Sequence, residues 1–217
     1  MGLLLNRKID KYSRVGLWKI TEKTEELFSK LRLEEKDQLT FQNFTHPQRK
    51  LQWLAVRNLT NKLLGKNNVR IRYDRNSKPQ INNNPHYISI SHTKQYAAVI
   101  LNKKDHTGID IELISPRIKK IEHKFMSEQE LNSLQPFNHI EQFYVYWSAK
   151  ESLYKLYGKK KLDFKENLFI EPFKYKSKGI ITGKIIKGNK VQPHKLRYEK
   201  KDSFMLVYVL NSLKGDR

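Results

Sequence analysis

Along this chain of 217 residues, apolar residues at helical spacing give way to short strand-like runs, and the same change occurs a second time. This succession constrains the fold more than any single motif. Helical spacing of three and four residues occupies much of 22–64, and short β-branched and aromatic runs follow at 68–114. The same succession returns between 127 and 210. An order of helices, strands, helices and strands predicts an α+β fold made of two units in succession. We place the boundary near 102–107, with an N-terminal α+β subdomain at 1–104 and a C-terminal one at 105–217.

Helix ends are marked by local signals. The first long helix follows His46-Pro47 and stops before Gly65, which suits a C-terminal cap. Ser127 and Glu130 have the spacing of a capping box. The longest helix is expected in "FYVYWSAKESLYKLYG" at 143–158. Strands are expected near 69–73, 87–91, 96–101 and 108–114, with three more between 179 and 210, the last at about 204–210.

The charge of the chain predicts an acidic partner. Lys and Arg total 43 against 22 Asp and Glu, which gives a formal charge of +21. Composition alone leaves nucleic acid, an anionic membrane surface, a phosphate-rich small molecule and an acidic protein open. The absence of cysteine excludes disulfides, thiolate metal sites and a cysteine nucleophile. No apolar run approaches the roughly 20 residues of a membrane span. We therefore expect a soluble, cytoplasmic protein.

Two carboxylates share one face of the expected strand in "TGIDIELI" at 107–114. Because side chains alternate along a strand, Asp110 and Glu112 point the same way, about 6 to 7 Å apart. A polar face on an ordinary edge strand would explain this pattern. The alternative is a cation site, because Mg²⁺ prefers oxygen ligands and is commonly held by a few carboxylates together with substrate phosphate.

The long aromatic helix carries a second group of charged residues. Trp147, Glu151 and Lys155 are four residues apart and share one helical face. A Glu four residues before a Lys is first of all an ordinary helix-stabilising pair, worth about 0.2–0.5 kcal/mol. Beside the Asp-x-Glu strand, Glu151 would complete a site of three carboxylates. Lys155 would then serve as a phosphate ligand, and Lys150 could support it, although the sequence leaves the role of Lys150 open.

A third feature is a basic, hydroxyl-bearing turn. Ser91 and His92 interrupt a strand-like run, and Lys78 lies upstream in "NSKP". These residue types suit phosphate binding, although a single His is more often structural or exposed. Arg49 and Lys50 lie on the first long helix, where solvated surface is the ordinary interpretation.

Taken together, these motifs resemble the Sfp-type 4′-phosphopantetheinyl transferases. The family pattern is Gly-x-Asp-x-Glu, followed about 35 to 45 residues later by Trp-Ser-x-Lys-Glu-x-x-x-Lys. The chain matches it with "GIDIE" at 108–112 and "WSAKESLYK" at 147–155, preceded by "NSKP" at 76–79 and "ISISHT" at 88–93. Each motif is weak alone, and the specificity comes from their combination and order.

The resemblance implies transfer of the phosphopantetheine arm of coenzyme A to a serine of an acyl or peptidyl carrier protein, with release of adenosine 3′,5′-bisphosphate. It also implies two similar α+β subdomains related by a pseudo-twofold axis, with coenzyme A held between them. Carrier proteins are acidic, which agrees with the charge of +21. The expected enzyme is a monomer that binds neither nucleic acid nor membrane. Which carrier it modifies does not follow from the sequence.

Residue by residue, the resemblance assigns Asp110, Glu112 and Glu151 to Mg²⁺ and Lys155 to the pyrophosphate of coenzyme A. The base that deprotonates the carrier serine stays open between Glu151 and a metal-bound water. Lys160 replaces the second glycine of a Gly-x-Gly that family members often have after the helix. The resemblance places Arg49, Lys50 and His92 near positions that bind the 3′-phosphate of coenzyme A, and Lys78 and Ser91 at other coenzyme contacts.

Two other functions compete with this interpretation. A Mg²⁺-dependent nuclease would also use Asp, Glu and a Glu-Lys pair around a metal ion. In such nucleases, however, the Glu-x-Lys usually lies on a strand close behind the Asp, whereas Lys150-Glu151 lies in an aromatic helix about 40 residues later. A basic nucleic-acid-binding protein is the non-enzymatic alternative, and spread-out lysines without a binding module weigh against it.

Overall fold

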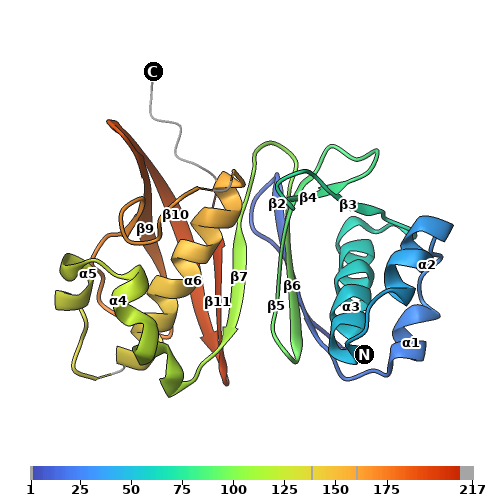
Figure 1. Ribbon diagram of the computed structural model, residues 1–217, viewed down its shortest axis with the longest axis horizontal. Coiled ribbons are helices and arrows are strands. Elements are labelled where there is room, and N and C mark those ends of the chain that lie inside the picture. The colour runs from blue at the N-terminus through green and yellow to red at the C-terminus, as the bar shows by residue number, and fades with distance from the viewer. Residues whose placement is uncertain (1, 138, 160, 211–217) are drawn as a thin grey trace. The chain divides into compact units, whose positions relative to one another are not determined.

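The structure is a computed structural model that describes residues 2–137, 139–159 and 161–210. The chain divides into two compact units, Met1–Lys104 and Asp105–Arg217. Each unit contains one β-sheet and the helices that pack on it, so the chain is a mixed α+β protein (Figure 1). No helix in the described part of the chain is both long and apolar enough to cross a membrane.

The first unit contains an antiparallel sheet of six strands in the order β1-β2-β6-β5-β4-β3. Helix α3 (Pro47–Leu64) packs against β2 and β6, and α1 packs against α3 (Figure 1). The strands are β1 (Leu3–Lys8), β2 (Ser13–Lys19), β3 (Ile71–Tyr73), β4 (Pro79–Ile81), β5 (Tyr87–His92) and β6 (Tyr96–Asn102), and the other helices are α1 (Thr24–Phe28) and α2 (Glu35–Gln42).

The predicted limits of α3 are confirmed. The helix begins at Pro47, where the missing N–H costs no helical hydrogen bond, and it ends before Gly65. Gly65 has φ of 61°, the left-handed conformation that a glycine adopts with least strain. Leu54 and Leu59 are fully buried, so the apolar face of the helix covers the sheet.

The prediction that the chain opens with helices is wrong, because the β1–β2 hairpin precedes α1. Neither strand has a clear period in the sequence. Strand β1 alternates half-buried and exposed positions, but its three leucines come first and its polar residues follow, and β2 is buried almost continuously. Gly16 in β2 marks a close approach, since a Cβ there would lie 2.8 Å from the side chains of Leu59 and Leu63. Strands β4 and β8 were also missed, because three residues are too few to show a period.

The second unit contains an antiparallel sheet of five strands in the order β7-β11-β10-β9-β8. Helix α6 (His139–Tyr157) lies along this sheet in contact with β7 and β11 (Figure 1). The capping box of Ser127 and Glu130 is confirmed, and Gly158 ends α6 with φ of 65°. The strands are β7 (Ile109–Leu113), β8 (Leu168–Ile170), β9 (Lys178–Lys187), β10 (Lys190–Lys201) and β11 (Phe204–Val209), and the shorter helices are η1 (Pro116–Ile121), α4 (Glu122–Phe125) and α5 (Glu128–Asn132).

Gly108 brings the start of β7 against the backbone of α6. A Cβ at this position would lie 1.8 Å from the carbonyl oxygen of Ser152, a distance that no side chain tolerates. The Ser152 hydroxyl donates to the Val207 carbonyl oxygen at 3.1 Å, which ties the same turn of α6 to β11. The glycine of the "GIDIE" motif therefore lets the strand that bears Asp110 and Glu112 lie close to α6.

Candidate functional site

The carboxylates of β7 occupy a sheet edge that is covered by α6. Asp110 pairs with Val207 and Glu112 with Met205 on β11, so both backbones are held in a regular ladder. Asp110 is almost completely buried, and Glu112 is half-buried. A buried carboxylate requires a compensating partner, because an uncompensated charge away from water is costly.

Lys155 supplies that partner to Asp110. Its ammonium group lies 2.7 Å from Asp110 Oδ1 and also donates to the carbonyl oxygen of Ile109 at 3.1 Å. Lys155 is in the last turn of α6, and Glu151 is one turn earlier. The structure therefore brings the Lys155 of the helix motif to the Asp110 of the strand motif.

Trp147 forms a second contact between the helix motif of α6 and the strand motif of β7. Its indole N–H donates to Glu112 Oε1 at 3.2 Å. The ring is fixed by stacking on Phe164, with centroids 5.5 Å apart, and by an edge contact with Phe125 at 5.1 Å. The indole thus orients Glu112 and is itself held in place by aromatic neighbours.

The acidic groups of this site repel one another. The pKa of Glu112 is raised to about 7, mainly by burial and also by the nearby Asp110 and Glu151, while the Trp147 hydrogen bond and Lys155 act in the opposite direction. The pKa of Glu151 is also raised, by burial first and then by Asp110. Asp110, Glu112 and Glu151 therefore lie within electrostatic range of each other, with more negative charge than Lys155 alone can balance.

The donor chemistry of the site fits Mg²⁺, since three carboxylates offer the hard oxygen ligands that this ion prefers. Their mutual repulsion, which adds to burial in raising the pKa of Glu112 and Glu151, is what a bound divalent cation would relieve. Within residues 2–137, 139–159 and 161–210, however, no three acidic or histidine side chains are already grouped around one point. Lys155 holds Asp110 instead.

The stability of the protein should depend on pH through Glu112. Its folded-state pKa of about 7 exceeds the ordinary value of 4.5, so the folded chain binds more protons than the unfolded chain between these values. The stabilisation that this group gives at low pH is then lost as pH rises through that window. In EDTA, wild type should lose more free energy of unfolding between pH 5 and pH 8 than Glu112→Gln does. Parallel pH profiles from urea titrations would contradict this.

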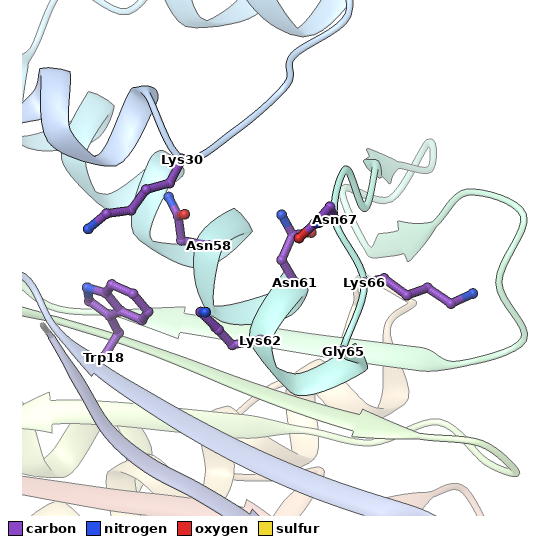
Figure 2. Close-up of a pocket in the computed structure, with 8 residues that line it drawn as sticks. All are labelled: Trp18, Lys30, Asn58, Asn61, Lys62, Gly65, Lys66 and Asn67. Carbon is purple, nitrogen blue, oxygen red and sulfur yellow. The ribbon is translucent and has the colours of Figure 1, made fainter.

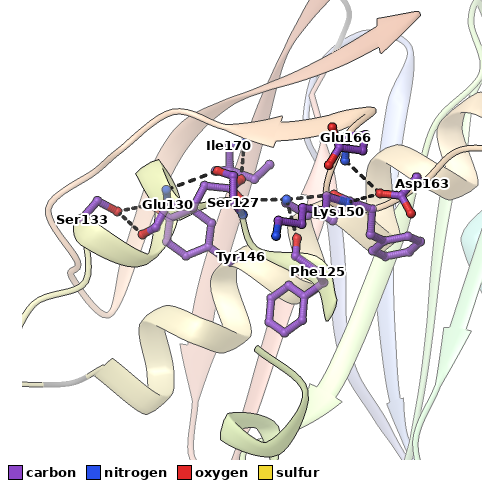
Figure 3. A network of polar contacts seen from close by, with 11 residues as sticks. Phe125, Ser127, Glu130, Ser133, Tyr146, Lys150, Asp163, Glu166 and Ile170 are labelled. Atoms are coloured by element: carbon purple, nitrogen blue, oxygen red, sulfur yellow. Dashed lines mark hydrogen bonds and ion pairs between the residues drawn. The ribbon is translucent and has the colours of Figure 1, made fainter. Parts of the chain in front are cut away.

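Lys150 does not face these carboxylates, so its interpretation as a phosphate ligand is wrong. Its side chain is completely buried, and its ammonium group donates to the carbonyl oxygen of Phe125 at 2.6 Å (Figure 3). It also donates to the carbonyl oxygen of Phe164 at 2.9 Å. A third contact, at 2.8 Å, joins it to Glu130 Oε2. These contacts use all three N–H groups of Lys150, because an ammonium has three donors.

Glu130 completes this network. Its Oε2 also accepts the backbone N–H of Ser127 at 2.8 Å, and its Oε1 accepts that of Ile170 at 2.8 Å (Figure 3). The carboxylate therefore links the start of α5, strand β8 and, through Lys150, the middle of α6. The network is structural, and its capping box is the only part of it that local sequence spacing predicts.

In the first unit, Arg49 and His92 are brought into contact. Arg49 Nη1 lies 2.6 Å from His92 Nε2, and the guanidinium also lies over the ring of Phe44 at 5.7 Å. Gln52, which the sequence analysis missed, donates to the carbonyl oxygen of Thr93 at 2.9 Å. Its position three residues after Arg49, on the same side of α3, was the available signal. The first turns of α3 are thus tied to the end of β5.

The other coenzyme-contact candidates have different surroundings from this pair. The ammonium of Lys50 lies 5.3 Å from the ring centroid of Phe41, so the neighbouring residue Arg49 is the one that reaches His92. Ser91 is buried within β5. Lys78 lies in the turn before β4, where its backbone N–H bonds Asp74 Oδ1 at 2.9 Å. Lys160 falls outside the described residues.

A hollow of about 470 Å³ lies at the opposite end of α3 (Figure 2). It extends from Trp18 to the residues around Gly65, with the side chains of Asn58, Asn61 and Lys62 along it. Arg49 is twelve residues before Asn61, or roughly 18 Å along the helix. The hollow is therefore separate from the Arg49–His92 pair.

Residues 106–202 match the sequence profile of the 4′-phosphopantetheinyl transferase superfamily. The matched region begins just before β7 and includes Asp110, Glu112, Glu151 and Lys155. No curated protein matches the chain. The predicted class of enzyme is confirmed at the level of the superfamily, because the chain contains a 4′-phosphopantetheinyl transferase superfamily domain.

Proposed function

We propose that this chain, with its 4′-phosphopantetheinyl transferase superfamily domain, transfers the 4′-phosphopantetheine group of coenzyme A to a serine of an acyl or peptidyl carrier protein. Adenosine 3′,5′-bisphosphate is the second product, and the enzyme is of the Sfp type. The observation that carries the proposal is the contact of Lys155 with Asp110 inside the matched region, with Glu112 and Glu151 in electrostatic range.

The reaction forms a bond between the serine oxygen and the phosphorus that bears the pantetheine. It breaks the bond between that phosphorus and the bridging oxygen of the pyrophosphate, which leaves with adenosine 3′,5′-bisphosphate. Asp110, Glu112 and Glu151 would hold Mg²⁺, and the bound ion would neutralise the negative charge on the leaving bisphosphate. Trp147 keeps Glu112 oriented through its indole N–H. Lys155, when it leaves Asp110, can donate to a pyrophosphate oxygen, since an ammonium binds phosphate as a point charge.

The serine proton must go to a base as the new bond forms. Glu151 is the candidate among the described residues of the site, because its raised pKa brings it closer to neutral pH, where a general base is most effective. Glu151 can accept the proton only through a carboxylate oxygen that is not bound to the metal. A water molecule of the site is the alternative base.

Arg49 and His92 are proposed to bind the 3′-phosphate of coenzyme A. Their 2.6 Å contact and the exposed position of Arg49 support this, since both side chains can donate to a phosphate oxygen. Lys50, Lys78 and Ser91 remain proposed coenzyme contacts on the resemblance alone. The pseudo-twofold relation between the two units, the monomeric state and the cytoplasmic location also remain predictions.

The proposed protein partner is an acidic carrier domain. The formal charge of +21 would attract such a partner and raise the encounter rate, and salt would weaken this attraction. Transfer at saturating coenzyme A should therefore show a carrier KM that rises with ionic strength.

The test is a mass measurement on apo carrier proteins. Carriers of fatty acid, polyketide and nonribosomal peptide synthesis are incubated separately with the protein, coenzyme A and Mg²⁺. At least one should gain the mass of phosphopantetheine, and the gain should vanish in EDTA or when the carrier serine is alanine. No mass gain on any carrier would contradict the proposal. Metal-dependent cleavage of DNA or RNA, which would indicate the nuclease alternative, should be absent.

A further inference from the structure

The ammonium of Lys155 is placed where it neutralises the most buried carboxylate of the site. The Asp110 side chain is 3% exposed and that of Lys155 is 26% exposed, and they meet at 2.7 Å. Lys155 also lowers the pKa of both Glu112 and Glu151, against the effects of burial and of Asp110. One lysine therefore acts on all three carboxylates.

Of the two members of this ion pair, Lys155 is the one that can move. Asp110 belongs to a strand whose backbone pairs with Val207 on β11. Lys155 has a flexible four-carbon side chain, is a quarter exposed, and lies two residues before the end of α6 at Tyr157. Moving the ammonium toward solvent requires rotamer changes only, whereas moving Asp110 would disturb the sheet.

We infer that Lys155 competes with the divalent cation for Asp110: the ion pair between Lys155 and Asp110 must open before Asp110 can become a ligand. The inference rests on the proposed function for the identity of the metal ligands. It goes beyond that function in stating that the Lys155–Asp110 ion pair weakens the binding of divalent cations, and that a phosphate-bearing ligand promotes metal binding by taking up the released ammonium.

The competition has a thermodynamic consequence. Any ligand whose phosphate binds Lys155 removes the competitor and raises the affinity for the cation. By linkage, the cation raises the affinity for that ligand by the same factor. Coenzyme A and the divalent cation should therefore bind cooperatively to wild type, and part of this cooperativity should disappear when residue 155 has no charge.

The experiment measures Mg²⁺ binding to the full chain by isothermal titration calorimetry, in the absence of coenzyme A. Lys155→Met should bind Mg²⁺ at least tenfold more tightly than wild type, which corresponds to 1.4 kcal/mol. Lys155→Gln, which keeps a donor for Asp110 without the charge, should also bind more tightly. Lys184→Met is the matched control. Lys184 is 32% exposed and forms a 2.8 Å ion pair with Glu171, so this variant loses the same charge and should bind Mg²⁺ as wild type does.

Two outcomes separate the inference from the proposed function. Mg²⁺ affinity in Lys155→Met and Lys155→Gln that equals or falls below that of wild type would overturn the inference. If Asp110→Asn still abolished binding in that case, the metal site itself would stand. Mg²⁺ binding that is indifferent to Asp110→Asn would overturn the assignment of the ligands and the inference with it. Circular dichroism establishes that each variant is folded.

Discussion

Asp110→Asn is expected to lower the rate of phosphopantetheine transfer about 10³-fold while leaving the fold intact. Asparagine has nearly the same shape as aspartate, so the side chain still fits at the edge of β7. It removes the charge that pairs with Lys155 and that we propose for the metal. A loss of several kcal/mol of charge stabilisation corresponds to a rate change of this size. The measurement is kcat/KM for a carrier at saturating coenzyme A, followed over a range of Mg²⁺ concentrations.

The matched control for this prediction is Glu171→Gln. Glu171 also forms a 2.8 Å ion pair with a lysine of the same unit, but it lies after β8 at the surface. This variant should keep wild-type transfer and wild-type Mg²⁺ dependence. If Asp110→Asn stayed within threefold of wild type with an unchanged Mg²⁺ dependence, the role of the β7 carboxylates would be refuted.

The two central motifs could be placed from the sequence because each depends on a local period. Alternation in β7 puts Asp110 and Glu112 two residues apart on one strand, and four-residue steps in α6 put Trp147, Glu151 and Lys155 on one face. A period of two or of about 3.6 is set by the backbone alone. The contact between the two motifs depends in addition on Gly108, whose missing Cβ lets β7 approach α6.

The roles of adjacent basic residues could not be predicted in the same way. Consecutive helical residues differ by about 100° around the axis, so a phase error of one residue exchanges their environments. Arg49 reaches His92 whereas Lys50 lies over Phe41. Lys150 and Lys155 are five positions apart, about 140° around the helix axis, so Lys150 points into the core whereas Lys155 faces Asp110.

The environment of Lys150 illustrates a second limit, which is sequence distance. Its partners are Phe125, Glu130 and Phe164, which are 25, 20 and 14 residues away. Two of these contacts are to carbonyl oxygens, so the partner side chains carry no signal. A buried lysine can be recognised only once the elements around it are placed in space. The β1–β2 hairpin was missed for a related reason, because its burial comes from contacts with β6 and α3 rather than from its own pattern.

The largest expected loss of stability follows from replacing Lys150. Lys150→Met should lower the free energy of unfolding by about 3–5 kcal/mol, because it leaves the completely buried Glu130 carboxylate without its counter-charge. Two carbonyl oxygens, those of Phe125 and Phe164, would also lose their donor. Methionine fills a similar volume, so the effect reports the lost charge and hydrogen bonds rather than a cavity. Urea titration followed by far-ultraviolet circular dichroism measures it.

Two further variants make this prediction specific. Lys165→Met, at an exposed position next to Phe164, should change the free energy of unfolding by less than about 0.5 kcal/mol. Adding Glu130→Gln to Lys150→Met should restore part of the stability, because the remaining buried group is then neutral and its side-chain oxygen can still accept a backbone N–H. If Lys150→Met instead kept wild-type stability and lost transfer activity, Lys150 would be a phosphate ligand after all. We expect the loss of stability, because the fully buried ammonium of Lys150 already donates three hydrogen bonds and has no N–H group left to bind a substrate.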